Sequence, residues 1–252
     1  MTTRAKKEYL RQLVAEKNRS FRPLTPEEKA LGFLGWHERG YLPHCDYPGL
    51  IQFVTFRLGD SMPSSSRGEW EHLLKIEDVR EKRTKLEEYL DRGVGECHLS
   101  DPRIANLTEA TLLHFHKERY ELLAWCVMLN HVHVLVHVWR TPLGNMVRSW
   151  KQWVETRAKT ILSERRLPGM ARTEDMGTRR AGRPALQSFW QREYWDTFMR
   201  DAEQEKKAVH YIEGNPVKAK LCRGAEDWPF GSVRFRDEFQ RLVTPNTQGT
   251  CD

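Results

Sequence analysis

The segment 129–138, LNHVHVLVHV, alternates histidine with valine at almost every second position. A period of two is typical of a β-strand, because successive side chains point to opposite faces of a sheet. His131 and His133 therefore lie next to each other on one face, close enough to hold a divalent metal ion between their imidazoles. The two histidines of an isolated His-x-His motif are more often hydrogen-bonded or solvated. The motif therefore needs partner residues before it indicates a functional site.

The segment HYIEGN supplies such partners. Tyr211 and Asn215 are four residues apart and share one face if this segment is helical. If that helix lies across the histidine face of the sheet, a metal ion held by His131, His133 and Asn215 would polarise a phosphodiester. The Tyr211 oxygen would attack the phosphorus in line, and a 3′-hydroxyl would leave. A second 3′-hydroxyl could reverse this step without ATP, so no nucleotide cofactor is expected.

Other side chains compete for these roles. Tyr194 in QREYWD is a second candidate nucleophile, and Tyr211 is preferred because it has an asparagine partner at helical spacing. His137 continues the histidine face, where we expect packing or solvation. His114 and His116 form another His-x-His pair, but their segment is predicted to be helical, and residues two apart on a helix do not face each other.

Composition limits the kind of protein that carries these residues. The chain has 252 residues, 39% of them hydrophobic, and nine tryptophans, which is typical of a folded globular protein. Its formal charge of +6 favours an acidic partner, either nucleic acid or an anionic membrane surface. No segment resembles a signal peptide or is long enough to cross a bilayer, which predicts a soluble cytoplasmic protein. The five cysteines form no Cys-x-x-Cys pair, which favours reduced thiols.

The elements that must position the site follow from periodicity. The chain should form a strand, a long amphipathic helix, two closely joined strands, a further helix and a late helix. These elements are expected within 49–62, 70–93, 119–128, 129–138, 141–162 and Ala202–Asn215. Their order predicts an α+β domain with a mostly antiparallel sheet and helices on its faces.

The sequence is expected to divide into a basic, partly helical accessory segment (1–48), a main domain (49–240) and a flexible tail (241–252). In the first part, Thr25 is a predicted N-cap before Pro26. Within the main domain, 163–188 is rich in Arg and Gly, which predicts a mobile loop. Candidate phosphate contacts are Arg165, Arg166, Arg172, Arg179, Arg180, Arg183, Gln191 and Arg192. A solubilising surface loop is the alternative. Candidates for stacking on bases, or for core packing, are Trp150, Trp153, Trp190 and Trp195.

Three segments together resemble the REP-associated tyrosine transposases, a branch of the single-tyrosine HUH transposases. They are MLNHVHVLV, FWQREYWDTFMRD and VHYIEGNPVKAKLCRGAEDWPFGSVRF. The resemblance runs from about residue 48 to 236. It implies that His131 and His133 are the HUH pair, Tyr211 the nucleophile and Asn215 the third metal ligand. It also implies a ferredoxin-like (RRM-like) α+β fold of the HUH nuclease type and a Mg²⁺ or Mn²⁺ cofactor. The implied partner is single-stranded DNA beside a hairpin, rather than a membrane, in the bacterial cytosol.

Two positions depart from the usual pattern of this family. Leu129 stands where a proline usually precedes Asn-His, and Lys220 stands where a glycine usually follows NPVKA. Lys220 adds a charge where a tight turn is expected. In addition, Pro216 disfavours helical geometry at Asn215, so the ligand role of Asn215 depends on how the helix ends.

The leading hypothesis is a metal-dependent single-stranded DNA endonuclease and strand transferase that forms a covalent 5′-phosphotyrosine on hairpins of REP-type palindromic repeats. One alternative is a non-cleaving nucleic-acid-binding module on the same fold. Another is a phosphodiesterase that activates water and uses Tyr211 only for packing. Only the first of these traps DNA on tyrosine. The resemblance allows either a monomer or a homodimer.

Overall fold

The computed structural model describes residues 3–39, 42–61, 68–69, 73, 76, 79–164 and 188–244. Six of the candidate phosphate contacts lie outside these residues, namely Arg165, Arg166, Arg172, Arg179, Arg180 and Arg183.

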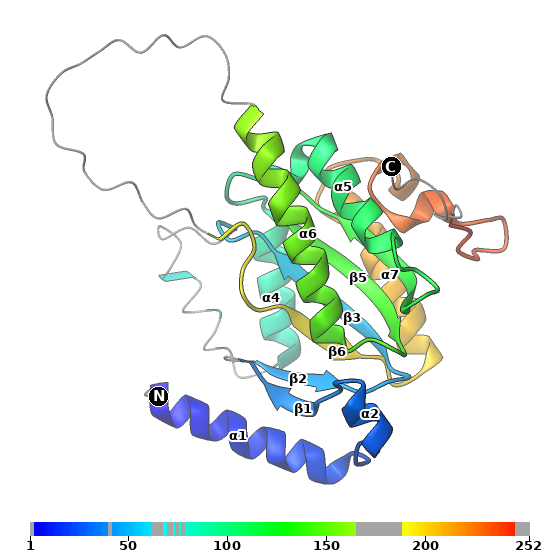
Figure 1. The fold of residues 1–252 in the computed structure, drawn as a ribbon. Helices are drawn as coiled ribbons and strands as arrows, with labels where there is room; N and C mark the ends of the chain where they lie inside the picture. Colours follow the sequence, from blue (N-terminus) through cyan, green and yellow to red (C-terminus); the bar gives the residue numbers. More distant parts are fainter. Residues whose placement is uncertain are drawn as a thin grey trace, which may run out of the picture.

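A four-stranded sheet forms the centre of the main domain (Figure 1). Its strands are β3 (Ile51–Arg57), β4 (Tyr120–Val127), β5 (His131–Val138) and β6 (Trp195–Phe198). They lie in the order β4-β5-β3-β6, and all neighbours are antiparallel. The first and third of these strands along the chain are central and the other two are at the edges, which is the ferredoxin-like arrangement. The predicted α+β fold is confirmed.

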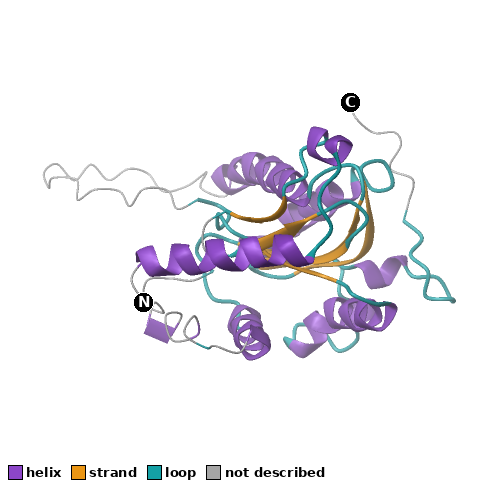
Figure 2. Cartoon of the chain, turned by 90° about the horizontal axis from the view of Figure 1, so that it is seen from below, coloured by secondary structure: helices purple, strands orange, loops and turns teal. Residues whose placement is uncertain are grey.

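Helices cover both faces of this sheet (Figure 2). They are α4 (Val79–Asp91), α5 (Pro102–Leu113), α6 (Leu143–Glu164) and α7 (Ala202–Lys218). Helices α5 and α6 contact each other, and in Figure 1 they lie in front of the sheet, with α7 behind it. Among the described residues, none of the helices is both long and apolar enough to span a lipid bilayer.

The larger core lies between the sheet and helices α5 and α6. The valine face of β5 is buried there, as the alternation of the sequence predicts. Trp150 and Trp190 belong to the same core and are 3% and 2% exposed, so packing is the role the structure gives them. Trp153 is half exposed instead and lies beneath the guanidinium of Arg157.

A smaller core lies on the opposite face, beneath α7. Phe53, Leu135 and Cys126 from three strands pack there against Ala208 and Ile212 of the helix. The helix begins at an N-cap in which the Asp201 carboxylate accepts a hydrogen bond from the Gln204 backbone N–H at 2.7 Å. Because the histidine face of β5 is this same face, α7 crosses the histidines, which is the condition on which the candidate site depends.

Helix α7 continues three residues beyond its predicted end, through Pro216 to Lys218. The proline removes one backbone donor, yet the last turn is closed by two hydrogen bonds, from Lys220 N–H to Val217 O and from Leu221 N–H to Pro216 O, both 2.9 Å. Asn215 therefore keeps a helical conformation and points to the same side as Tyr211.

The described residues among the first 48 form two helices, in a segment expected to be partly helical, and a hairpin that the sequence does not predict. The elements are α1 (Thr3–Ser20), α2 (Pro26–Ala30), β1 (Gly35–Glu38) and β2 (Pro43–Asp46). The predicted N-cap is confirmed, since Thr25 and Glu28 form a reciprocal capping box. Asp46 accepts hydrogen bonds from the backbone N–H of Leu34 and of Leu143, so the hairpin is joined to the start of α6.

Candidate active site

His131 and His133 lie in the first half of β5 and are both buried. Their Nε2 atoms are 3.0 Å apart and face each other. This is the separation expected of two nitrogens that lie about 2.1 Å from one metal ion at a right angle. The pair is therefore shaped for a shared ligand.

Both remaining ring nitrogens are held by oxygen atoms. His131 Nδ1 lies 2.8 Å from Asn130 Oδ1, and His133 Nδ1 lies 2.8 Å from Thr55 Oγ1. The amide of Asn130 is itself oriented, because its Nδ2 donates to the Val94 carbonyl at 2.9 Å. An oxygen that accepts from Nδ1–H leaves a lone pair on Nε2, which is the usual outer-shell support of a metal-binding histidine.

The electrostatic surroundings keep His131 uncharged. Burial lowers its pKa to about 3, and the positive charges of Arg57 and Lys218 contribute to the decrease. At neutral pH this imidazole has a free lone pair and can bind a metal ion.

Helix α7 brings Asn215 to the histidine pair. The side chain of Asn215 is fully buried, and its Nδ2 lies 3.3 Å from His133 Nε2. Its Oδ1 is also buried and has no hydrogen-bond partner among the described residues. An unsatisfied buried amide oxygen is costly, and rotation of the amide would turn it toward the place between the imidazoles. A divalent ion there would satisfy this oxygen, so the residues fit a metal site.

Tyr211 lies one helical turn before Asn215. Its ring is half-buried and makes edge contacts with His133, at 5.7 Å between centroids, and with Phe53, at 5.9 Å. Tyr194 is located elsewhere, against His44 and Arg39, with its ring 4.6 Å from that of His44. Burial also raises the pKa of Tyr194. The structure thus places Tyr211, and not Tyr194, beside the histidine pair.

Three charged side chains that the sequence did not single out surround this pair. Asp91, the last residue of α4, has Oδ1 at 3.9 Å from His131 Nε2 and Oδ2 at 3.1 Å from Lys218 Nζ. Arg57 is opposite His131 in the β3–β5 register and is buried. Strand alternation places Arg57 on the histidine face and helical spacing places Lys218 near Tyr211, whereas no local signal indicates Asp91.

A metal ion at this site would need an amide oxygen as its third protein ligand. Among the described residues, no three His, Cys, Asp or Glu side chains converge closely enough to hold a metal ion. His131 and His133 with the Asn215 amide are therefore the set that fits, and solvent or a phosphate oxygen would complete the coordination.

The other sequence candidates lie outside this arrangement. His137 is at the far end of β5, 4.0 Å from the Glu121 carboxylate. His114 follows the last residue of α5, and His116 accepts a hydrogen bond from the Leu122 backbone N–H, so neither faces the pair. Gln191 Nε2 donates to the Gly59 carbonyl near the end of β3, and Arg192 is exposed.

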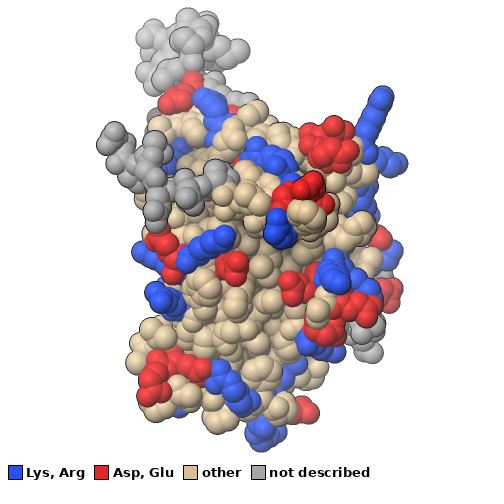
Figure 3. Space-filling view, turned by 90° about the vertical axis from the view of Figure 1, so that its right-hand side faces the viewer, with Lys and Arg blue, Asp and Glu red and all other residues tan. Residues whose placement is uncertain are grey.

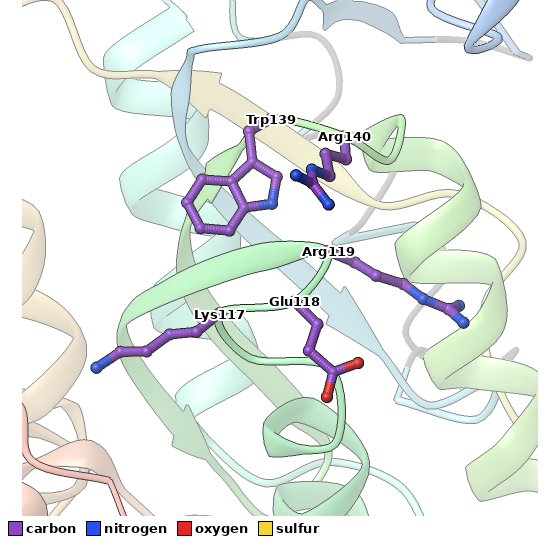
Figure 4. A pocket seen from close by; sticks show the side chains of 5 residues that line it. All are labelled: Lys117, Glu118, Arg119, Trp139 and Arg140. Atoms are coloured by element: carbon purple, nitrogen blue, oxygen red, sulfur yellow. The ribbon is translucent and has the colours of Figure 1, made fainter.

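A pocket of about 590 Å³ lies at the opposite end of β5 from the histidine pair. Its lining residues are Lys117, Glu118, Arg119, Trp139 and Arg140. Figure 4 shows Lys117 and Arg119 pointing in different directions, so its cations do not converge. On the face drawn in Figure 3, basic and acidic side chains are intermixed, and no single basic patch stands out.

A ferredoxin-like sheet with a His-x-His pair on a central strand, beneath a helix that carries a tyrosine, is the arrangement that the resemblance to single-tyrosine HUH transposases implies. Two curated relatives agree with this class. They are a putative REP-associated tyrosine transposase of Haemophilus influenzae and a REP-associated tyrosine transposase of Escherichia coli. The first is 25% identical over 130 residues, and the second is 26% identical over 126. The resemblance of the chain to REP-associated tyrosine transposases is confirmed.

These matches span 52% and 50% of this chain, and 67% and 61% of the relatives. A solved structure of a REP-associated tyrosine transposase bound to a REP hairpin aligns with 87% of this chain and 99% of its own, at 15% identity and a TM-score of 0.48. No family model matches the chain.

Proposed function

We propose that this protein is a transposase that cleaves and rejoins single-stranded DNA beside REP-type hairpins through a covalent bond between Tyr211 and a 5′-phosphate. The observation that carries the proposal is the convergence on His133 of two α7 side chains, the Tyr211 ring at 5.7 Å and the Asn215 amide at 3.3 Å. A binding module has no need of this combination. The names of the two curated relatives support the same conclusion.

His131, His133 and Asn215 would hold a Mg²⁺ or Mn²⁺ ion, which when bound polarises the phosphodiester and offsets negative charge in the transition state. The Tyr211 oxygen forms a bond to phosphorus while the P–O3′ bond breaks. The phenolic proton passes to solvent, and the departing 3′-oxygen takes up a proton. Attack by another 3′-hydroxyl on the phosphotyrosine reverses these changes and rejoins the strand.

DNA contacts would come from both described and undescribed residues. Lys218 is a partly exposed cation beside the histidine pair, and Gln191 and Arg192 lie just before β6, the edge strand of the same sheet. The arginines of 165–183 remain candidate phosphate contacts. These groups would position the backbone, whereas bases in the single-stranded flank would carry sequence information.

The test uses a labelled oligonucleotide with a hairpin and a short single-stranded flank, incubated with protein and Mg²⁺ or Mn²⁺. We expect a denaturant-resistant adduct with the wild type and with Tyr194→Phe, and none with Tyr211→Phe or His131→Ala. Circular dichroism confirms that each variant is folded. Cleavage without an adduct would instead support a phosphodiesterase that activates water. Hairpin binding with neither product, in both metals, would indicate the non-cleaving module.

A further inference from the structure

Lys218 lies on the face of α7 that carries Tyr211, the proposed nucleophile. It follows Asn215 by three residues and Tyr211 by seven, so all three lie along one side of the helix. Its Nζ is 5.4 Å from the centre of the Tyr211 ring. The side chain is 45% exposed, so the ammonium group is accessible to a ligand that arrives from solvent.

Asp91 holds this ammonium group in place. Its carboxylate is only 10% exposed and lies 3.1 Å from Lys218 Nζ, with its other oxygen 3.9 Å from His131 Nε2. Asp91 is also the last residue of α4, where the negative end of the helix dipole disfavours a carboxylate. Its position therefore has a cost for the helix, and the contact with Lys218 offsets that cost.

We infer that Lys218 is a further catalytic residue, which contacts a non-bridging oxygen of the scissile phosphate, and that Asp91 is the positioning residue that directs it. This inference rests on the function proposed above. As the Tyr211 oxygen attacks, negative charge is shared among the phosphoryl oxygens, and a fixed cation beside them lowers the barrier. A lysine suits this role as a compact point charge that forms and exchanges contacts readily.

If the Lys218–Asp91 pair only held α4 and α7 together, different results would be expected. It would stabilise the fold, and its loss would change activity only through folding or metal binding. A catalytic Lys218 instead acts on the chemical step, so the rate should fall by more than any change in stability or Mn²⁺ affinity accounts for. Lys207 provides a matched control, since it lies on the same helix, pairs with Glu203 at 2.6 Å and is 74% exposed.

The experiment measures the single-turnover rate of adduct formation at saturating hairpin DNA for Lys218→Met, Lys218→Arg, Asp91→Asn and Lys207→Met. Mn²⁺ affinity, from electron paramagnetic resonance, and the melting temperature are measured for the same variants. We expect Lys218→Met to lower the rate by about 10²-fold, the usual effect of removing one transition-state donor. Lys218→Arg should restore most of the rate because it keeps the charge, and Lys207→Met should match the wild type.

Asp91→Asn should lower the rate by about 10-fold, the lower end of the effects of outer-shell substitutions. It should not weaken DNA binding, because it removes a negative charge from the site. Equal rates for Lys218→Met and the wild type would overturn the inference. So would a decrease in rate that is matched by an equal loss of Mn²⁺ affinity or a large drop in melting temperature. Absence of an adduct in the wild type would overturn the proposed function, which separates the two failures.

Discussion

Buried histidines lie at two places in the described part of the chain, and the charges that shift the pKa of His131 and of His44 differ in sign. His131 is flanked by the cations Arg57 and Lys218, and burial together with these charges lowers its pKa to about 3. His44 lies between two carboxylates, with Nδ1 2.5 Å from Asp196 Oδ1 and Nε2 3.2 Å from Glu193 Oε2. Burial lowers the pKa of His44, but the hydrogen bonds to these carboxylates outweigh burial and raise it to about 9.

The same residue type therefore has two opposite uses in one fold. A neutral imidazole keeps a lone pair for a metal ion, whereas a protonated imidazole offers two donors and no lone pair. His44 joins β2 of the first hairpin to β6 at the edge of the main sheet, so it links segments about 150 residues apart in sequence. The first group is suited to binding and chemistry, and the second to holding the N-terminal hairpin in place.

The largest effect is expected from the loss of one histidine of the His131–His133 pair. His133→Ala removes one proposed metal ligand and the partner of both Asn215 and Tyr211. A metal acting on a phosphoryl oxygen contributes several kcal/mol, so adduct formation should fall by about 10³-fold. Titration with Mn²⁺ should show a parallel loss of affinity. Normal Mn²⁺ binding by this variant would show that the pair is not the metal site.

The protonated histidine should matter for stability instead. His44→Ala leaves Glu193 and Asp196 buried without a counter-charge, which costs about 3–5 kcal/mol in the free energy of unfolding. Urea denaturation at pH 6.5 measures the loss. The control is His137→Ala, since His137 is half-buried and only 4.0 Å from Glu121 at the surface. A loss of under 1 kcal/mol for His44→Ala would mean that the carboxylates are not held by a charged imidazole.

This contrast also shows what sequence patterns can predict. Alternation in β5 gave the histidine face, and the four-residue spacing in α7 placed Tyr211 and Asn215 together, because both periods are local properties of the backbone. His44, Glu193 and Asp196 come together only through tertiary packing of β2 against β6. Asp91 likewise meets Lys218 across more than a hundred residues, and no local pattern marks either contact. The β1–β2 hairpin is short and weakly alternating, so its strands gave no signal.

The pH dependence of stability should separate the two groups further. The folded-state pKa of His44 is raised, so its contribution is complete below about pH 6.5 and is lost as the pH rises through about 9. The difference in unfolding free energy between the wild type and His44→Ala should thus shrink by about 3 kcal/mol between pH 6.5 and pH 9. Lys151, which is buried nearby, titrates in both proteins, so the difference isolates His44. A difference that stays constant over this range would show that His44 carries no extra proton in the folded protein.

The smallest effect concerns the end of the helix that carries Tyr211. Lys220 follows the C-cap of α7 with φ +59°, a left-handed conformation that disfavours any residue with a Cβ atom. Glycine adopts it without strain, so Lys220→Gly should increase the free energy of unfolding by about 1 kcal/mol. Lys220→Ala is the control, because it removes the charge but keeps Cβ, and it should give little gain. Equal stabilisation by both substitutions would assign the effect to the charge of Lys220. If glycine alone stabilises, backbone strain is its source, and adduct formation should stay at the wild-type rate because the positions of Tyr211 and Asn215 do not change.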